Sequence, residues 1–472
     1  MTSRECAALA LSVTCATALF TAAPASTAPA TAAPVVAPLG GDQGQTRARD
    51  PYFPLSGNQG YDVQHYDLGL DFTPASHELA AEATITARAE RRLARFTLDY
   101  SGPPIQRITV DGREAAYRRE GQKLTVVPAE ALRPGRDFTV QVRYGGRPEP
   151  INDPALGLYG WINTDDGAVT LNEPDGARTW YPVNDDLRDK ATYTFRITTP
   201  TGVTALANGE PQGRPRAGNG RTTATWTMAK PMASYLAMVA IGNFDVTRTQ
   251  VDGIPNITAY DPAIPGDDSF LHSATAAAEQ WGVTKFGRYP FDSMGGVIDP
   301  SDAGYALETQ SRPVYDSPPD ESAVVHESAH QWFGDSVTPT SWQDIWLNEG
   351  FATYAEWLWQ EEHGGPSAQE TFDGLYATPA GDPFWQLKTG DPGRDEMFNY
   401  DVVYLRGAMT LQELRSTIGD DAFFRLLREW NERYRYGNVG TCDLIRLAEE
   451  ISHRDLQPLF QAWLYTAAKP AR

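Results

Sequence analysis

Hydrophobic and polar residues alternate along much of the first half of the chain, between about Tyr52 and Gln250. The clearest alternating runs are Ala83 to Glu90, Lys123 to Val127, Phe138 to Tyr144 and Ala191 to Ile197. Turn dipeptides punctuate this region, namely Asp111-Gly112, Asn208-Gly209 and Asn219-Gly220. Alternation bounded by such turns is typical of half-buried strands. We therefore predict a β domain over residues 51–250.

Beyond Gln250 the pattern becomes helical, and a first helix is expected from Ser269 to Gly282. Two more helices are expected at 324–333 and 346–356, followed by helical segments at 405–418, 421–431, 442–452 and 456–464. GGVIDP and the stretch from Ala306 to Tyr315 are candidates for short strands. We predict that residues 251–472 form a second, mainly helical domain, which makes the chain an α+β multidomain protein.

The N-terminus has the features of an export signal. Arg4 precedes an apolar run from Cys6 to about Phe20, and small residues follow at Ala22, Ala23 and Ala25. The run is too short to span a bilayer comfortably, so stable membrane insertion is not expected. We predict a signal peptide over residues 1–25 and a secreted, extracellular protein.

The next 25 residues differ from both the signal and the β domain. Residues 26–50 are rich in Pro, Ala and Thr and then become polar, as expected of a disordered spacer. The residues before Cys15 match a lipid-attachment signal poorly, so lipoprotein anchoring is not expected. Removal of the signal would leave Cys442 as the one remaining cysteine, and no intrachain disulfide is then possible.

Composition and charge narrow the classes of function. The 472 residues, of which 41% are hydrophobic and 21% charged, are typical of a globular protein with two or three cores. The formal net charge of -21 repels phosphate backbones and anionic lipid, so nucleic-acid binding is not expected. Composition does not determine the oligomeric state, and a monomer is our working expectation.

The segment VVHESAHQWFGD, from Val324 to Asp335, carries the candidate chemistry. His326 and His330 stand four residues apart, so in a helix both imidazoles leave the same face and can bind one metal ion. Glu327 lies between them, where a carboxylate can take the proton of a water bound to that ion. The chain has seven histidines, so two incidental histidines at this spacing in a buried helix would be unusual.

A catalytic zinc ion needs a third protein ligand and one open position. Eighteen residues separate His330 from Glu349 in WLNEGFATYAE, which is enough to end one helix, cross a loop and begin another. Glu349 is therefore the leading third ligand. Glu356 is its rival, but it lies about two turns, or roughly 10 Å, further along the same helix.

HESAH followed by eighteen residues and the Glu of NEGFA resembles the gluzincin metallopeptidases of the aminopeptidase N and leukotriene-hydrolase family. The resemblance implies a saddle-shaped N-terminal β domain and a thermolysin-like catalytic domain. It also implies one Zn2+ per chain, held by His326, His330 and Glu349, with Glu327 as the catalytic base. The 123 residues after Glu349 leave no room for the family's large C-terminal helical domain, so we expect a short form.

Tyr404 is the candidate for stabilising the oxyanion that develops during peptide hydrolysis. Its segment VVYLRGAM is similar to the family's Tyr-Glu-Lys-Gly segment, whose tyrosine donates a hydrogen bond to the oxyanion, and Gly407 would allow close packing. Leu405 and Arg406 replace the Glu-Lys pair. Tyr400 is the nearest substitute, and a core aromatic is the alternative interpretation.

Two glutamates are candidates for binding a substrate's free α-ammonium. YALET, residues 305–309, aligns with the family's Gly-Ala-Met-Glu-Asn motif and matches it at Ala306 and Glu308. Glu173, in TLNEPDG, resembles the glutamate of the family's Thr-Gln-Phe-Glu-Pro segment, which also faces the amine. Convergence on an ammonium is chemically reasonable because a buried cation needs opposite charge. Each residue alone could be an ordinary surface glutamate.

These residues together predict a secreted zinc aminopeptidase that acts on peptides with a free N-terminus. A zinc endopeptidase on the same scaffold is the first alternative, if the incomplete Gly-Ala-Met-Glu-Asn match means that the amine site is lost. A catalytically silent exported binding protein is the second alternative, but neither a metal ligand nor the base is missing. Arg178 and Lys190 are candidates for fixing the β domain against the catalytic domain.

Overall fold

The computed structural model describes residues 50–471. The predicted signal peptide and nearly all of the predicted spacer lie outside these residues. Within the described part of the chain, no helix is long and apolar enough to cross a membrane.

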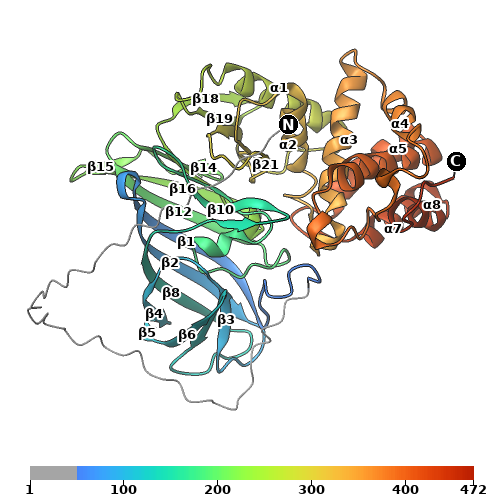
Figure 1. Ribbon diagram of the computed structural model, residues 1–472. Coiled ribbons are helices and arrows are strands. Elements are labelled where there is room, and N and C mark those ends of the chain that lie inside the picture. Colours follow the sequence, from blue (N-terminus) through green and yellow to red (C-terminus); the bar gives the residue numbers. More distant parts are fainter. Residues whose placement is uncertain (1–49, 472) are drawn as a thin grey trace, which may run out of the picture. The chain divides into compact units, whose positions relative to one another are not determined.

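The largest element of the fold is a nine-stranded sheet, seen in blue and green in Figure 1. Along the sheet the order is β14-β16-β12-β1-β2-β8-β4-β5, with β15 paired to β16. Its strands are β1 (Tyr61–Thr73), β2 (Glu78–Ala89), β4 (Ile105–Val110), β5 (Arg113–Glu114), β8 (Asp137–Gly146), β12 (Ala191–Pro200), β14 (Glu210–Pro211), β15 (Arg216–Gly218) and β16 (Arg221–Met232). β1 and β12 are parallel, and the other pairs are antiparallel. Alternating burial in β12 and β2 confirms that the period-two runs are strands with one face in the core.

Two smaller sheets complete the β-rich part. A five-stranded sheet has the order β13-β17-β11-β10-β9, and a three-stranded sheet has the order β3-β7-β6. Their strands are β3 (Phe96–Asp99), β6 (Ala116–Glu120), β7 (Lys123–Val127), β9 (Ile151–Asp153), β10 (Gly157–Asn163), β11 (Ala168–Leu171), β13 (Thr204–Ala207) and β17 (Val239–Gly242). Edge-on packing of Phe72 against Trp161, with ring centroids 5.2 Å apart, joins the large sheet to the five-stranded one.

A fourth sheet connects the β-rich part to the helices. Its order is β18-β19-β20-β22-β21, and helix α1 (Ser269–Phe286) packs against β19 and β20. The strands are β18 (Asp245–Val251), β19 (Ile254–Tyr260), β20 (Met294–Ile298), β21 (Ala306–Leu307) and β22 (Val314–Tyr315). The short strands expected after the first helix are therefore confirmed. The β18–β19 hairpin crosses residue 250, and the division of the chain at that residue stays a prediction.

The helical part begins with α2 (Glu321–His330) and α3 (Trp346–Glu362). The later helices are α4 (Ala368–Tyr376), α5 (Arg406–Ile418), α6 (Asp420–Arg433), α7 (Thr441–Ser452) and α8 (Gln457–Leu464). Figure 1 shows α3 to α8 gathered on one side of the sheets. All the helices expected from periodicity are present, and α4 is an additional one. The fold is thus a β-rich N-terminal region followed by a mainly helical region, as the α+β prediction stated.

Two glycines set the distance between α3 and α5. A Cβ atom added to Gly407 would lie 2.8 Å from the Cα of Gly350, and one added to Gly350 would lie 3.0 Å from the Cα of Gly407. Atoms at such distances overlap, so the helices cross at a separation that only glycine permits. The expectation that Gly407 allows close packing is confirmed.

Lys190 links the β-rich region to the helical region. Its Nζ donates to the carbonyl oxygens of Asp335, Ser336 and Gly437, at 3.1, 3.0 and 3.1 Å. Arg178 instead forms an ion pair with Asp175, at 3.2 Å. Because Asp175 lies within the β-rich region, the idea that Arg178 joins the two domains is wrong.

Candidate metal centre and active site

His326 and His330 leave the same face of α2, and Glu349 reaches them from the first turn of α3. Glu349 Oε2 lies 3.2 Å from His326 Nε2 and 3.4 Å from His330 Nε2. The three side chains each offer one ligand atom, and these atoms lie within 4.8 Å of one another. The structure therefore brings all three predicted metal ligands together at one point.

The other ring nitrogens of the two histidines are occupied by hydrogen bonds. His326 Nδ1 lies 2.7 Å from Glu356 Oε1, and His330 Nδ1 lies 3.0 Å from the carbonyl oxygen of Phe333. Each Nδ1 donates to its oxygen partner, which leaves the Nε2 lone pair free to bind a metal. Glu356, the rival third ligand, thus lies behind His326 and orients it.

The donor set and its spacing fit zinc. Two imidazole nitrogens and one carboxylate oxygen are the ligand set of many catalytic zinc sites. A tetrahedron with zinc–ligand bonds of about 2.0–2.1 Å has edges of about 3.4 Å, close to the two separations from Glu349 Oε2. His326, His330 and Glu349 are therefore the residues that would hold one zinc ion.

Electrostatics at the same point favour a cation. Burial by itself lowers the pKa of His330, but the Glu349 and Glu308 carboxylates raise it by more, to about 9. Burial raises the pKa of Glu349, but His330 and His326 lower it to about 2. The surroundings therefore stabilise positive charge next to an ionised Glu349, and a divalent metal ion supplies such charge.

Glu327 is held beside the metal ligands by its place on α2. Its side chain is 7% exposed and lines a cavity of about 350 Å³ that also contains both histidines. Burial raises its pKa to about 7, although His326 and His330 act to lower it. A carboxylate with a pKa near neutrality can both accept and return a proton at physiological pH.

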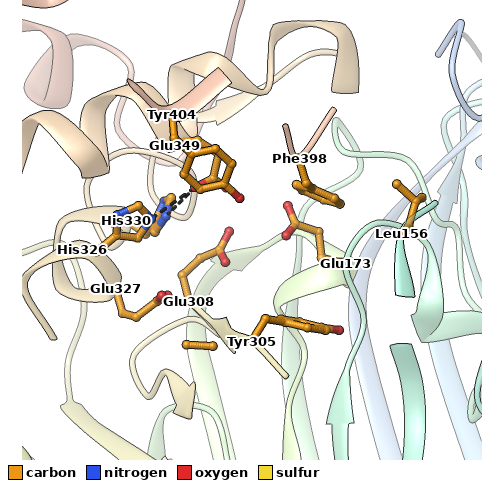
Figure 2. A pocket seen from close by; sticks show the side chains of 11 residues that line it. Leu156, Glu173, Tyr305, Glu308, His326, Glu327, His330, Glu349, Phe398 and Tyr404 are labelled. Atoms are coloured by element: carbon orange, nitrogen blue, oxygen red, sulfur yellow. Dashed lines mark hydrogen bonds and ion pairs between the residues drawn. The ribbon is translucent and has the colours of Figure 1, made fainter. Parts of the chain in front are cut away.

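Tyr404 lies in a π-helical turn, Tyr400–Leu405, immediately before α5. Its ring lies parallel to that of His326, with centroids 6.0 Å apart, and Figure 2 shows its hydroxyl pointing into the cavity. Burial raises its pKa well above the ordinary value, so the hydroxyl keeps its proton and is a hydrogen-bond donor. Tyr400 is 59% exposed and does not line the cavity, so the structure favours Tyr404 over its substitute.

Two further carboxylates line the cavity across from the metal ligands. Glu173 follows β11, and Glu308 follows β21, whose Ala306 also lines the cavity. Glu173 Oε1 and Glu308 Oε1 are buried without a hydrogen-bond partner, and Figure 2 shows both carboxylates pointing inward. Burial, followed by repulsion from Glu308, raises the pKa of Glu173 well above its ordinary range. Two buried carboxylate oxygens without hydrogen-bond partners form a site for a cation.

The far wall of the cavity is apolar and was not predicted. Leu156 from the β9–β10 turn, Phe398 from the loop before Tyr400 and Tyr305 line it. Figure 2 shows Leu156 beyond Glu173 as seen from the histidines, with Phe398 above Glu173 and Tyr305 below it in this view. Leu156 and Phe398 lie in loops with no motif, so only the fold could bring them to the site. An ion pair between Asp153 and Arg394 joins the loops that carry them.

Most of the chain matches two domain models of one peptidase family. Residues 62–236 match the Peptidase M1 N-terminal domain, and residues 306–463 match the Peptidase family M1 domain. Aminopeptidase N of Streptomyces lividans is 28% identical over 451 residues, which cover 86% of this chain and 50% of that protein. Aminopeptidase 2 of Candida albicans is 25% identical, and the match covers 46% of that protein. The chain thus spans about half the length of the curated relatives that it matches.

This chain matches solved structures of M1 zinc metallopeptidase from Deinococcus radiodurans over nearly their whole length. One has a TM-score of 0.81 and 31% identity, covering 88% of this chain and 95% of the other. A mutant of that enzyme bound to a Tyr-Ser-Ala substrate has a TM-score of 0.80 and 31% identity, with 88% and 96% coverage. Zinc metallopeptidases thus share both the sheet arrangement and the helical part that carries the three ligands. The chain therefore belongs to peptidase family M1, a family of zinc metallopeptidases.

Proposed function

We propose that the protein is a secreted zinc aminopeptidase that removes the first residue of peptides with a free N-terminus. The proposal rests on the closeness of three carboxylates in the cavity. Glu173, Glu308 and Glu349 each offer a carboxylate oxygen, and the three oxygens lie within 4.8 Å of one another. A substrate ammonium held by Glu173 and Glu308 would therefore lie next to the metal ligand Glu349, about one residue from the reacting carbonyl.

The amine site explains why cleavage would occur after the first residue. An α-ammonium can pair with Glu173 Oε1 and Glu308 Oε1, two buried oxygens without a hydrogen-bond partner, whereas an acetylated terminus carries no charge for either carboxylate. The side chain of the first residue branches from the carbon that bears the amine, so it would face Leu156, Tyr305 and Phe398. The adjacent peptide carbonyl would then lie between Glu327 and Tyr404.

The chain's own residues then carry the proton transfers. Zinc, when bound by His326, His330 and Glu349, supplies Lewis acidity and makes a bound water more acidic. The Glu327 carboxylate accepts a proton from the attacking water and delivers it to the nitrogen of the leaving amine. The Tyr404 hydroxyl donates a hydrogen bond to the carbonyl oxygen as negative charge develops there.

A pair of substrates tests the proposal. The purified enzyme is assayed on a short peptide with a free N-terminus and on the same peptide acetylated at that position. We expect kcat/KM to fall by at least about 100-fold on acetylation, because two buried carboxylates then lose their partner. Equal cleavage of both peptides would instead indicate a zinc endopeptidase. Absence of turnover on peptide panels despite one bound zinc would indicate a silent binding protein.

Secretion and assembly are separate parts of the proposal. The charged start, the apolar run and the small residues of the first 25 positions support export. Intact mass measured on protein from the culture medium should show loss of about these 25 residues, whereas retention of the full chain inside cells would contradict export.

Light scattering on the mature protein should give the mass of a monomer.

A further inference from the structure

Gln331, which directly follows the metal ligand His330, connects the amine-binding segment to the helix of the catalytic base. It is 1% exposed. Its Nε2 donates to the carbonyl oxygen of Glu308 at 3.1 Å, and its Oε1 accepts from the backbone N–H of Ser311 at 2.7 Å. The same Nε2 lies 3.4 Å from the carbonyl oxygen of Glu327. One carboxamide thus holds the backbones of the amine acceptor and of the base.

The segment held by Gln331 has a backbone that needs support. Ser311 has a φ of 68°, in the left-handed region that non-glycine residues rarely adopt. The β-rich region fixes the same segment from the other side, because Asn208 Nδ2 donates to the carbonyl oxygen of Gln310 at 2.8 Å and Gly209 N donates to Ser311 Oγ at 2.9 Å. Among these contacts, only those of Gln331 connect the segment to α2. The position of Glu308 relative to Glu327 therefore depends on this side chain.

We infer that Gln331 is a positioning residue that sets the distance between the amine acceptor Glu308 and the base Glu327, and so restricts cleavage to the first peptide bond. This inference rests on the proposed aminopeptidase function. An α-amino acid places its amine and its carbonyl carbon on the same atom, so the span from amine to carbonyl is short and fixed. A β-amino acid lengthens that span by one carbon–carbon bond, about 1.5 Å. If Gln331 holds Glu308 and Glu327 at a fixed distance, the enzyme should cleave the longer β-amino substrate poorly.

The carboxamide of glutamine suits all these contacts. The position requires a donor for the Glu308 carbonyl and an acceptor for the Ser311 N–H, and glutamine provides both on one group. Glutamate keeps the acceptor and loses the donor, while methionine has similar length and loses both. The variants Gln331→Glu and Gln331→Met therefore release one or both sides of the link.

The test compares alanine p-nitroanilide, its β-alanine analogue and N-acetylalanine p-nitroanilide. We expect the wild type to prefer the α-amino substrate strongly. In Gln331→Met, the ratio of kcat/KM for the α over the β substrate should fall by about tenfold or more, since displacements near 1 Å have effects of up to about 100-fold. Most of the change should appear as a higher KM for the α substrate, with zinc content unchanged.

Gln412→Met is the matched control. Gln412 is 5% exposed in α5, and its carboxamide accepts from Tyr354 Oη at 2.7 Å and donates to Gln369 Oε1 at 2.9 Å. This variant also removes a buried carboxamide, but one that contacts neither Glu308 nor Ser311, so the substrate ratio should stay as in the wild type. Gln331→Glu, which keeps the Ser311 contact, gives the same test if Gln331→Met does not fold.

The results distinguish failure of the Gln331 positioning role from failure of the proposed aminopeptidase function. If the wild type cleaves the acetylated substrate as well as the free one, the aminopeptidase proposal fails. If the wild type is selective and the Gln331 variants keep its α over β ratio, whether or not kcat falls, the positioning role is wrong. A falling ratio in Gln331→Met or Gln331→Glu, with an unchanged ratio in Gln412→Met, supports it.

Discussion

At the scale of single residues, Tyr404 has the most direct catalytic prediction. Its hydroxyl points into the cavity beside His326 and has no role in binding the metal. Tyr404→Phe removes the donor to the developing oxyanion, so turnover should fall by about two to three orders of magnitude. Steady-state kinetics give the loss, and metal analysis should still find one zinc per chain.

Tyr400→Phe is the control for this variant because Tyr400 precedes Tyr404 by one turn and its ring is 5.5 Å away. Its hydroxyl removal should leave turnover within about twofold of the wild type. Near-normal turnover in Tyr404→Phe, or an equal loss in both variants, would remove the assignment.

Glu356 would act on a bound metal ion through His326. Its Oε1 accepts from His326 Nδ1 at 2.7 Å, and its Oε2 accepts from Ser322 Oγ at 2.5 Å. Glu356→Gln removes the charge that makes His326 a better ligand, so zinc affinity should fall by about 10- to 100-fold. Competition with a chelator measures the affinity. Glu362→Gln, at the end of the same helix, should not change it, and an unchanged affinity in Glu356→Gln would contradict the orienting role.

Asp299 is a buried acid outside the active site that affects stability. It is 1% exposed, neither of its carboxylate oxygens has a hydrogen-bond partner, and burial raises its pKa to about 8. Its pKa in the unfolded chain is about 4, so the folded state binds the extra proton between about pH 4 and 8. The stability that protonated Asp299 contributes is present below pH 4 and is lost as the pH rises through about 8.

Asp299→Asn replaces this acid by a neutral group of the same shape. The gain in melting temperature over the wild type should grow between pH 5 and pH 8, because each pKa unit corresponds to about 1.4 kcal/mol. Asp245→Asn, at an exposed position, should show no such trend. A gain for Asp299→Asn that is the same at both pH values would contradict the raised pKa.

Residue spacing predicted the metal ligands, and the family resemblance predicted the proposed amine site, but neither predicted the surroundings. His326 and His330 follow from helix periodicity, Glu349 from the eighteen-residue interval after His330, and Glu173 and Glu308 from the family resemblance. The role of Glu356 could not be read from spacing, because two helical turns place it too far from the ion but not from the back of His326. Leu156 and Phe398 reach the cavity through loops, whose paths local sequence does not determine.

At the scale of secondary-structure elements, the crossing of α3 and α5 links the third ligand to Tyr404. Gly350 directly follows Glu349, and Gly407 lies three residues after Tyr404. Gly407→Ala would place a methyl group 2.8 Å from the Cα of Gly350 and force the helices apart. We expect a loss of stability of about 1–3 kcal/mol, and a fall in turnover as Tyr404 moves away from the metal site.

Gly374→Ala is the matched control. Gly374 lies inside α4, and a Cβ there would meet nothing within 4 Å. Alanine should stabilise this helix by up to about 1 kcal/mol and leave activity unchanged. Chemical denaturation and steady-state kinetics on both variants measure the contrast. Equal effects of the two substitutions would show that the close crossing is unimportant.

Hydrophobic periodicity predicted most of the helices and strands and missed those whose apolar pattern is weak. Long helices such as α1 and α7 were predicted because their buried faces repeat over several turns. In α4 only Ala368 and Phe372 are buried, so nine residues carried too little apolar signal. The π-helical turn at Tyr400–Leu405 was not predicted either, because no residue pattern distinguishes such a turn from ordinary helix.

At the scale of the whole molecule, the proposed active site draws on both regions of the chain. The helical region would supply the metal ligands and the base, while Glu173 and Leu156 come from the β-rich region. Lys190 holds the two regions together through three backbone carbonyls, two of them just after α2. The sequence indicated two domains and their classes, but the contacts between them depend on tertiary packing, as the incorrect role for Arg178 shows.

We expect activity to depend on one zinc ion bound by His326, His330 and Glu349. The decisive measurement is anomalous diffraction from crystals of active enzyme, recorded above and below the zinc absorption edge. We predict one strong peak per chain at about 2.0–2.2 Å from both Nε2 atoms and a Glu349 carboxylate oxygen, present only above the edge. Fully active crystals with no anomalous peak at that position would contradict zinc-dependent catalysis at these three residues.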